Sequence, residues 1–121
     1  MVNVDIKGLG VSLTTSLRQH AVRRLDSAFN RIAARVERIT LRIGDLNGPR
    51  GGRDKFCRIL VKMTGMDAVY VEDKCDDLYA AISHAVERAS WASVRRLRHI
   101  KLKGKGHHQQ RNFGLTSLEP G

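Results

Sequence analysis

The side chains of this sequence best suited to chemistry are long cations, and the chemistry they favour is binding to a polyanion. The chain holds 22 Lys and Arg against 12 Asp and Glu, a net charge of +10. The charge is gathered, since no acid occurs from Arg88 to Leu118 while five acids fall within residues 67–77. Each bound phosphate requires a nearby cation. This asymmetry therefore predicts a nucleic-acid-binding surface and argues against a uniformly basic coat.

The basic residues fall on two stretches with the spacing of amphipathic helices. Apolar residues recur every three or four positions within residues 17–32, and again within 78–100. We expect Arg95, Arg96 and Arg98 to lie on an exposed face of the second helix. The basic side chains are Arg18, Arg23, Arg24 and Arg31 in the first helix, and Arg88, Arg95, Arg96, Arg98, His99, Lys101 and Lys103 in the second.

Trp91 lies one helical turn from Arg88 and from Arg95. An indole there could stack on a base, but buried tryptophan is common in small cores. We expect Trp91 to pack on the sheet and keep stacking as the alternative. Aromatic residues make up only 5% of the chain. This favours recognition of RNA shape and phosphates over a strand-borne platform of stacked bases.

The sequence gives little support for a catalytic nucleophile or a metal site. The histidines are scattered, and His107 and His108 taken with either Cys57 or Cys75 lack the spacing of zinc ligands. Cys57 is expected in the core. Cys75 lies near a helix start, where a thiol pKa can fall, so an enzyme using Cys75 stays as an alternative. The acids within residues 72–77 are expected to cap and complement that helix. We predict no catalytic site, no metal and no cofactor.

A sheet is needed to position the two helices. Apolar and polar residues alternate in 2–7, which predicts a half-buried strand, and the same period recurs in 38–43, 57–63 and 68–72. Residues 44–54 hold four glycines and a proline, and predict an exposed hairpin loop. A short turn is expected around Gly65.

The first helix is predicted over 15–34, with its N-cap among residues 14–16, and the second starts within 73–77 and ends near Leu102. The fold class is α+β, in the order β-α-β-β-β-α. It is a four-stranded sheet with two helices packed on one face, similar in topology to a double-stranded RNA-binding domain. The opposite sheet face is expected to show Arg38, Arg42, Arg58 and Lys62.

The length of 121 residues predicts one domain. We expect an α+β domain over 1–103 and a flexible basic C-terminal tail over 104–121. No stretch approaches the roughly 18 apolar residues of a membrane helix, and the N-terminus lacks a signal-peptide pattern. Two cysteines are too few for a disulfide framework. These features favour a cytoplasmic protein with no membrane partner.

Two segments resemble a known family. Residues 76–82, Asp-Asp-Leu-Tyr-Ala-Ala-Ile, resemble the D-[ML]-Y-A-A-I segment of the ribosome hibernation promoting factor and ribosome-associated inhibitor A family, also called sigma-54 modulation proteins. Residues 11–18 are similar to that family's entry into its first helix. The resemblance covers about residues 1–103 and points to the short form of the family. The chain departs from the family at Ser83, where Asp is frequent, and at 89–93, which lacks the expected basic and Leu residues.

The resemblance implies a bacterial, non-enzymatic stationary-phase factor with no small-molecule substrate. Residues 1–103 would be a ribosome-binding domain whose partners are the small ribosomal subunit and its rRNA. Occupying the mRNA and tRNA channel, it would silence translation, which is ribosome hibernation. The RNA contacts carried over to matching positions are Arg18, Arg23, Arg24, Arg88, Arg95, Arg96, Arg98, Lys101 and Lys103. The alternative is a free-standing double-stranded RNA-binding module.

Overall fold

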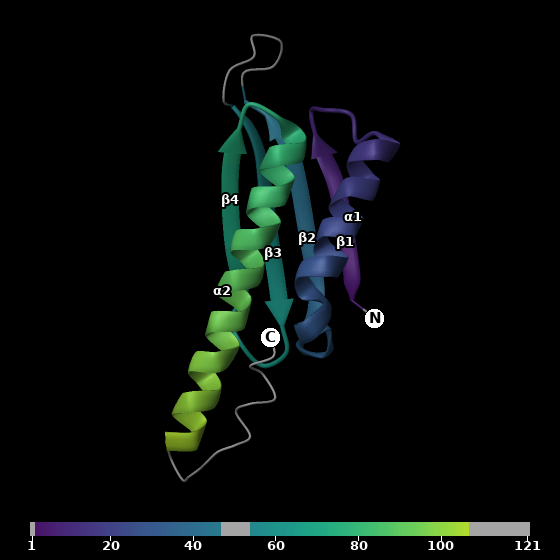
Figure 1. Cartoon of the computed structure of the whole chain (residues 1–121). Coiled ribbons are helices and arrows are strands. Elements are labelled where there is room, and N and C mark those ends of the chain that lie inside the picture. The colour runs from purple at the N-terminus through teal and green to yellow at the C-terminus, as the bar shows by residue number, and fades with distance from the viewer. Residues whose placement is uncertain (1, 47–53, 107–121) are drawn as a thin grey trace.

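The computed structural model describes residues 2–46 and 54–106, with side chains described as far as His99. Figure 1 shows a sheet covered on one face by two helices, which confirms the predicted fold class. The elements are β1 (Asn3–Leu9), α1 (Thr15–Phe29), the 3-10 helix η1 (Asn30–Arg35), β2 (Val36–Asp45), β3 (Lys55–Met63), β4 (Val69–Cys75) and α2 (Leu78–Gly106).

The four strands lie in the order β1-β2-β3-β4. β1 runs parallel to β2, with Ile6 opposite Leu41, because α1 carries the chain back across the sheet between them. The other pairings are antiparallel. α2 packs across β3 and β4, and α1 lies beside it on the same face.

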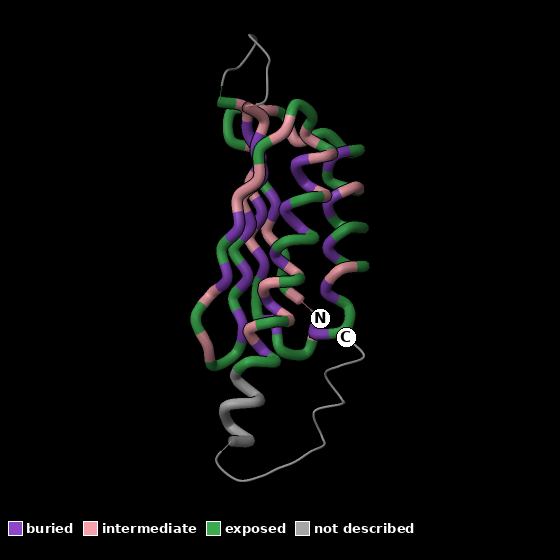
Figure 2. The backbone as a smooth tube through the Cα atoms, turned by 60° about the vertical axis from the view of Figure 1, so that its left-hand side comes forward, coloured by how far each residue is buried: buried purple, intermediate pink, exposed green. Residues whose placement is uncertain are grey.

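The core lies between this face and the helices, as the band of buried residues in Figure 2 shows. Alternate strand residues point into it, and each large aliphatic side chain buried there contributes about 1.5–3 kcal/mol. α2 presents mainly small side chains to the sheet, which lets its axis come close to the strands. The residues of α2 that are fully buried are Ala81, Ile82, Ala85, Val86, Ala89 and Ser93.

The opposite face of the sheet carries the four predicted cations, Arg38, Arg42, Arg58 and Lys62. The register places Arg38 beside Lys62 and Arg42 beside Arg58. Phe56 is a buried residue on this face, since its neighbour Cys57 points into the core. Its ring closes over Gly44, where a Cβ would lie 2.3 Å from the ring, and the Arg58 guanidinium covers it 4.4 Å from the ring centroid.

The first helix ends earlier than the sequence predicts. The α-helix stops at Phe29, and residues 30–35 continue as η1. This tighter segment turns the chain back toward β2 while keeping Ile32 in the core. The N-cap falls within the predicted range, because Thr14 Oγ1 accepts a hydrogen bond from the Leu17 N–H at 3.1 Å.

The second helix begins later than predicted. Asp73 and Cys75 belong to β4, since they pair with Cys57 and Lys55 of β3. The helix starts at Leu78 and has no acid in its first turn. The expectation that the whole acidic run complements this helix end is therefore wrong. Asp77 caps it, and its Oδ2 accepts the Ala80 N–H at 3.1 Å.

The chain connections follow the predicted pattern where they are described. The Leu46 N–H donates to the Asp54 carbonyl at 2.9 Å, and Gly65 has a φ of 73° in the β3–β4 turn. Residues 47–53 of the predicted hairpin loop lie outside the described residues, as do residues 107–121 of the predicted tail. α2 continues beyond Leu102 to Gly106. None of the described helices has the length and apolar composition needed to span a membrane.

The Asp77 cap leads to a stability prediction. Asp77→Ala should lower the free energy of unfolding by about 1 kcal/mol, because the Ala80 N–H loses its acceptor. Asp77→Asn should keep most of the stability, since an asparagine oxygen caps about as well. Urea unfolding followed by circular dichroism measures both. Equal destabilisation of the two variants would contradict a hydrogen-bond cap and indicate a purely charge-based effect.

Candidate nucleic-acid interface

The outward stripe of α2 is basic and contains one aromatic residue. Arg88, Trp91, Arg95 and Arg98 follow one another at spacings of three and four residues, so they lie along one side of the helix. All four are exposed. The stripe lies opposite the buried side chains of α2, whose packing on the sheet fixes the rotation of the helix.

Arg96 departs from the predicted exposed face. It is half-buried, and its Nη1 donates to the carbonyls of Asp67 at 2.9 Å and Ala68 at 3.3 Å. These bonds tie α2 to the β3–β4 turn. Of the three residues predicted to share an exposed face, only Arg95 and Arg98 do so, and Arg96 has a positioning role instead.

Arg88 combines exposure with anchoring. Its Nη1 donates to the Glu72 carbonyl at 3.0 Å and lies 3.5 Å from Asp73 Oδ2. Part of its charge is therefore neutralised at the edge of β4. By contrast, Arg95 makes no hydrogen bond or ion pair with the residues that the structure describes.

The three basic residues predicted on α1 are all exposed, but they do not share one side of the helix. Arg24 lies one turn from Ala28 on the side that faces α2. Arg18 lies one turn from Val22, which lines a hollow beside β1. Arg24 is therefore the member of this set closest in position to the outward stripe of α2.

Direct contacts hold α1 against α2. The Ser90 hydroxyl donates to the Ala28 carbonyl at 2.9 Å. Nearer the start of α2, His20 Nε2 lies 2.9 Å from Ser83 Oγ and 3.2 Å from the Tyr79 carbonyl. Ser83, a departure from the family pattern, thus takes part in the helix–helix contact. The relative position of the basic residues on the two helices is fixed by these bonds.

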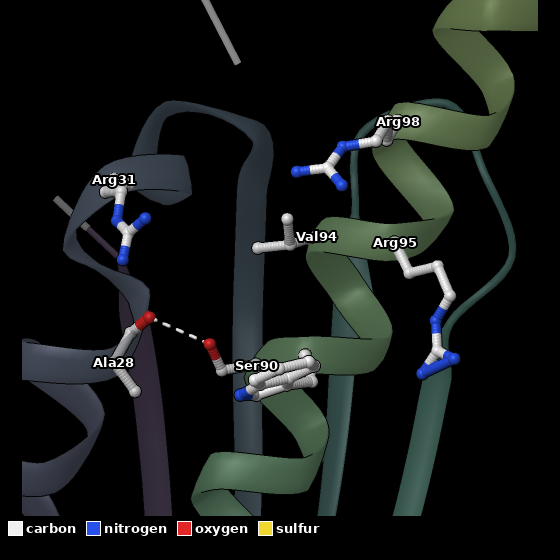
Figure 3. Close-up of a pocket in the computed structure, with 7 residues that line it drawn as sticks. Ala28, Arg31, Ser90, Val94, Arg95 and Arg98 are labelled. Atoms are coloured by element: carbon white, nitrogen blue, oxygen red, sulfur yellow. Dashed lines mark hydrogen bonds between the residues drawn. The ribbon is translucent and has the colours of Figure 1, made fainter. Parts of the chain in front are cut away.

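A hollow of about 520 Å³, here called the interhelical groove, lies beyond the Ser90–Ala28 contact. Figure 3 shows Arg31 and Arg98 reaching into it from opposite helices, with Val94 between them. None of the described residues that line it is acidic. The lining residues are Ala28 and Arg31 from α1 and η1, and Ser90, Trp91, Val94, Arg95 and Arg98 from α2.

The expectation that Trp91 packs on the sheet is wrong. Its side chain is 68% exposed, the largest fraction among the exposed large hydrophobic residues. A buried position was expected because buried tryptophan is common in small cores. The one-turn spacing from Arg88 and Arg95 nevertheless placed Trp91 on the charged side of the helix. Arg31, which the sequence placed on the basic face of the first helix but not among the RNA contacts, also belongs to this region.

The open face of the sheet is also basic, but two of its arginines are paired with carboxylates. Arg42 pairs with Asp5 at 3.0 Å, and Arg58 pairs with Glu72 at 2.9 Å. The hydrogen bond from Arg42 holds the pKa of the Asp5 carboxyl below its usual value. The hydrogen bond with Glu72 raises the pKa of the Arg58 guanidinium. Both carboxyls are thus matched to sheet cations, which leaves fewer charges on this face for a polyanion.

Among the described residues, one group of side chains could hold a metal. Ligand atoms of Asp73, Cys75 and His84 all lie within 4.8 Å of one another, and Cys75 Sγ is 3.4 Å from His84 Nδ1. These are donors that zinc accepts. However, Asp73 already faces the Arg88 guanidinium, and its Oδ1 accepts the Lys74 N–H at 3.0 Å. A bound cation would have to displace the ion pair, so the cluster is better matched to its present contacts.

The two cysteines occupy different environments. Cys57 is completely buried, as predicted, and burial raises the pKa of its thiol to about 12, with Asp73 acting in the same direction. Cys75 is half-buried at the end of β4, three residues before α2 begins at Leu78, and so lies near a helix start as predicted. Its neighbour is the His84 imidazole.

Lys101 and Lys103 are the remaining two predicted RNA contacts, and they lie on the last turns of α2. Their side chains lie outside the described residues. Their assignment as RNA contacts stays a prediction.

Comparison with known proteins gives a family and a fold. Residues 4–105 match the family described as sigma 54 modulation protein / S30EA ribosomal protein. A ribosomal subunit interface protein from Coxiella burnetii is similar at a TM-score of 0.66 and 16% identity, covering 79% of this chain and 97% of that one. The N-terminal domain of Thermus thermophilus Protein Y is similar at a TM-score of 0.64 and 23% identity, covering 78% and 98%. At these identities the two structures show the fold alone. No curated protein matches the sequence significantly.

The difference between the cysteines leads to a reactivity prediction. At pH 8 a thiol of pKa about 12 is ionised in roughly one molecule in ten thousand, and the thiolate is the reactive form. A disulfide reagent should therefore label one thiol of the native protein, Cys75, and both after unfolding. Cys75→Ser should remove the native reaction. Labelling of native Cys75→Ser at a similar rate would show that Cys57 is accessible and contradict its burial.

Proposed function

This chain belongs to the sigma 54 modulation protein / S30EA ribosomal protein family, and on that premise we propose that it is a non-enzymatic factor that binds the small ribosomal subunit. It occupies the mRNA and tRNA channel and silences translation in the stationary phase or under stress. The family match confirms the resemblance first seen in residues 76–82. A protein with this role works in the cytoplasm, where its partner is rRNA.

The observation that carries the proposal is the charge of the helical side. The helices hold nine arginines between Thr15 and Arg35 and between Leu78 and His99, against two acids, Asp26 and Glu87. Arginine suits this task because its guanidinium donates two parallel hydrogen bonds to a phosphate. A surface of this kind binds the RNA backbone without needing a particular sequence.

The names of the similar structures support the choice of partner. The Coxiella burnetii protein is described as a ribosomal subunit interface protein. A protein that lies at such an interface meets RNA on its exposed surfaces. We assign the same partner to this chain because its helical side offers the charge that rRNA requires.

Each arginine of α2 has its own part in this proposal. Arg95 and Arg98 contact phosphates, and Arg24 extends the contact onto α1. Arg88 and Arg96 orient α2 through the carbonyls of Glu72, Asp67 and Ala68. The orienting bonds matter because they hold the charges on a rigid support before binding, which lowers the entropic cost of association.

A matched pair of charge-reversal variants tests the location of the interface. Arg24, Arg95 and Arg98 changed to Glu should lower affinity for small subunits by on the order of 100-fold or more, because three cations become repulsive. Lys7 also lies on the open sheet face, where it pairs in register with Arg42. The control changes Lys7, Arg38 and Lys62 to Glu, which alters net charge equally. Co-sedimentation through sucrose gradients measures both. Arg96 is left unchanged because its loss would free the β3–β4 turn.

The control should bind nearly as well as the unmodified protein. Equal loss in both variants would mean that net charge alone drives binding, and loss only in the sheet variant would move the interface to the other face. Unmodified protein that stays at the top of a low-salt gradient would refute the proposal. Preference for a plain RNA duplex over small subunits would favour the double-stranded RNA-binding alternative. An enzyme using Cys75 would lose its function in Cys75→Ser, whereas ribosome binding should not change.

The salt dependence of binding gives a second test. Engagement of about six phosphates predicts that the logarithm of the association constant falls against the logarithm of salt concentration with a slope of roughly −4 to −5.5. The helix-side variant should show a clearly shallower slope, because fewer counterions are released. Sedimentation at several salt concentrations supplies the data. A slope near zero would indicate an apolar interface.

A further inference from the structure

We propose that Trp91 is a stacking site for one unpaired nucleobase of the bound RNA, with the nucleotide's phosphates held by the arginines around it. The inference rests on the proposed function, which supplies RNA as the partner. It goes further because it names the ligand as an unpaired base. Phosphate contacts alone would not distinguish such a base from a duplex.

The exposure of Trp91 is the first step of the argument. An indole that is 68% exposed leaves a large apolar surface in water, which folding would normally remove. Among the described residues its ring has no aromatic or cation–π partner. The flanking residues, Ser90 and Ala92, have side chains too short to cover it. The Trp91 ring therefore has no stacking role among the described residues.

The charge around Trp91 identifies the ligand class. Arg88, Arg95 and Arg98 lie on the same stripe of α2, and Arg31 reaches toward Arg98 from η1 (Figure 3). An apolar peptide or a lipid tail would leave the Arg95 guanidinium, which has no partner among the described residues, without a counterion. A nucleotide matches both the exposed indole and the arginines. Its base has an apolar face for the ring, and its phosphate has anionic oxygens for the cations. Base stacking on aromatic rings beside cations is a common way of binding single strands.

The shape of the surface gives the strand a path. Trp91 and Arg95 line both the interhelical groove and a second hollow of about 580 Å³ between α2 and β4. They form the ridge between the two hollows, and Figure 3 shows Arg95 pointing to the side of α2 away from the groove. A strand that crosses this ridge would place a base on Trp91, one phosphate near Arg98 and the next near Arg95.

The support under this ridge is rigid. The Ser90 hydroxyl bonds to the Ala28 carbonyl, and the Ser93 hydroxyl, fully buried, bonds to the Ala89 carbonyl at 2.8 Å. Small residues at 89, 90, 92 and 93 bring α2 close to its neighbours and leave Trp91 projecting. The segment 89–93, where the sequence departs from the family pattern, thus acquires a function in this chain.

Duplex RNA is a poor ligand for such a site, because its bases are already stacked on one another. Extruding a base from a duplex has an energetic cost that a single strand does not have. The site therefore prefers a single-stranded or bulged segment. This separates it from the phosphate contacts, which a duplex and a single strand both offer.

Trp91 is the only tryptophan of the chain, so its fluorescence reports on this site alone. The full chain is titrated with a short single-stranded oligoadenylate and, separately, with an RNA duplex of equal length. We expect strong quenching by the single strand and little by the duplex. Trp91→Ala should weaken single-strand binding about tenfold, and Trp91→Phe should retain most of the affinity, because one stacked base contributes an effect of this size. Duplex binding by Trp91→Ala should change by less than about twofold.

Co-sedimentation of the same variants with small subunits separates this proposal from the previous one. Binding by the unmodified protein, weakened in Trp91→Ala and restored in Trp91→Phe, together with quenching, supports the stacking site. Normal binding by Trp91→Ala without quenching would overturn it and leave ribosome binding intact. Weaker ribosome binding by Trp91→Ala without quenching by the single strand would also overturn it, since Trp91 would then contact a ribosomal protein. Failure of the unmodified protein to sediment would refute ribosome binding itself.

Discussion

The rotation of α2 about its own axis is the constraint on which the surface of this protein depends. The helix buries Ala85, Ala89 and Ser93 completely, and these small side chains let its axis come close to the sheet. Once that stripe faces inward, the opposite stripe must face outward, because side chains recur every 3.6 residues. Exposure of Trp91, Arg95 and Arg98 follows from the same packing that stabilises the core.

Polar contacts at the edges of α2 then refine its position. Arg96 bonds to the β3–β4 turn, Arg88 to β4, and Ser90 to α1. Two arginines that contribute to the overall positive charge therefore also act as structural ties. Net charge alone does not distinguish them from Arg95, which has no such partner in the described structure. A surface that binds RNA by charge thus combines supporting residues with contacting ones.

The two faces of the molecule are both basic, yet they differ in how that charge is balanced. On the sheet, Glu72 lies opposite Arg58 in the strand register and pairs with it, and Arg42 reaches the diagonal Asp5. On the helices, acids are few and the arginines surround a groove and an exposed indole. A polyanion gains from the helical side because Arg95 there has no internal partner among the described residues that would compete with it. This difference is why the sheet face is a useful control for the helix face.

The sequence predicts the class of fold, the order of the elements and the basic character of both helices, because hydrophobic period and charge are local properties. It also placed Cys57 in the core and Arg38, Arg42, Arg58 and Lys62 on the open sheet face. The extension of β4 to Cys75 and the start of α2 after the Asp77 cap depend on the tertiary structure, since strand pairing with β3 overrides the local acidic pattern. The tertiary structure alone decided that Arg96 turns inward and Trp91 outward, because the rotation of α2 depends on partners far away in the sequence.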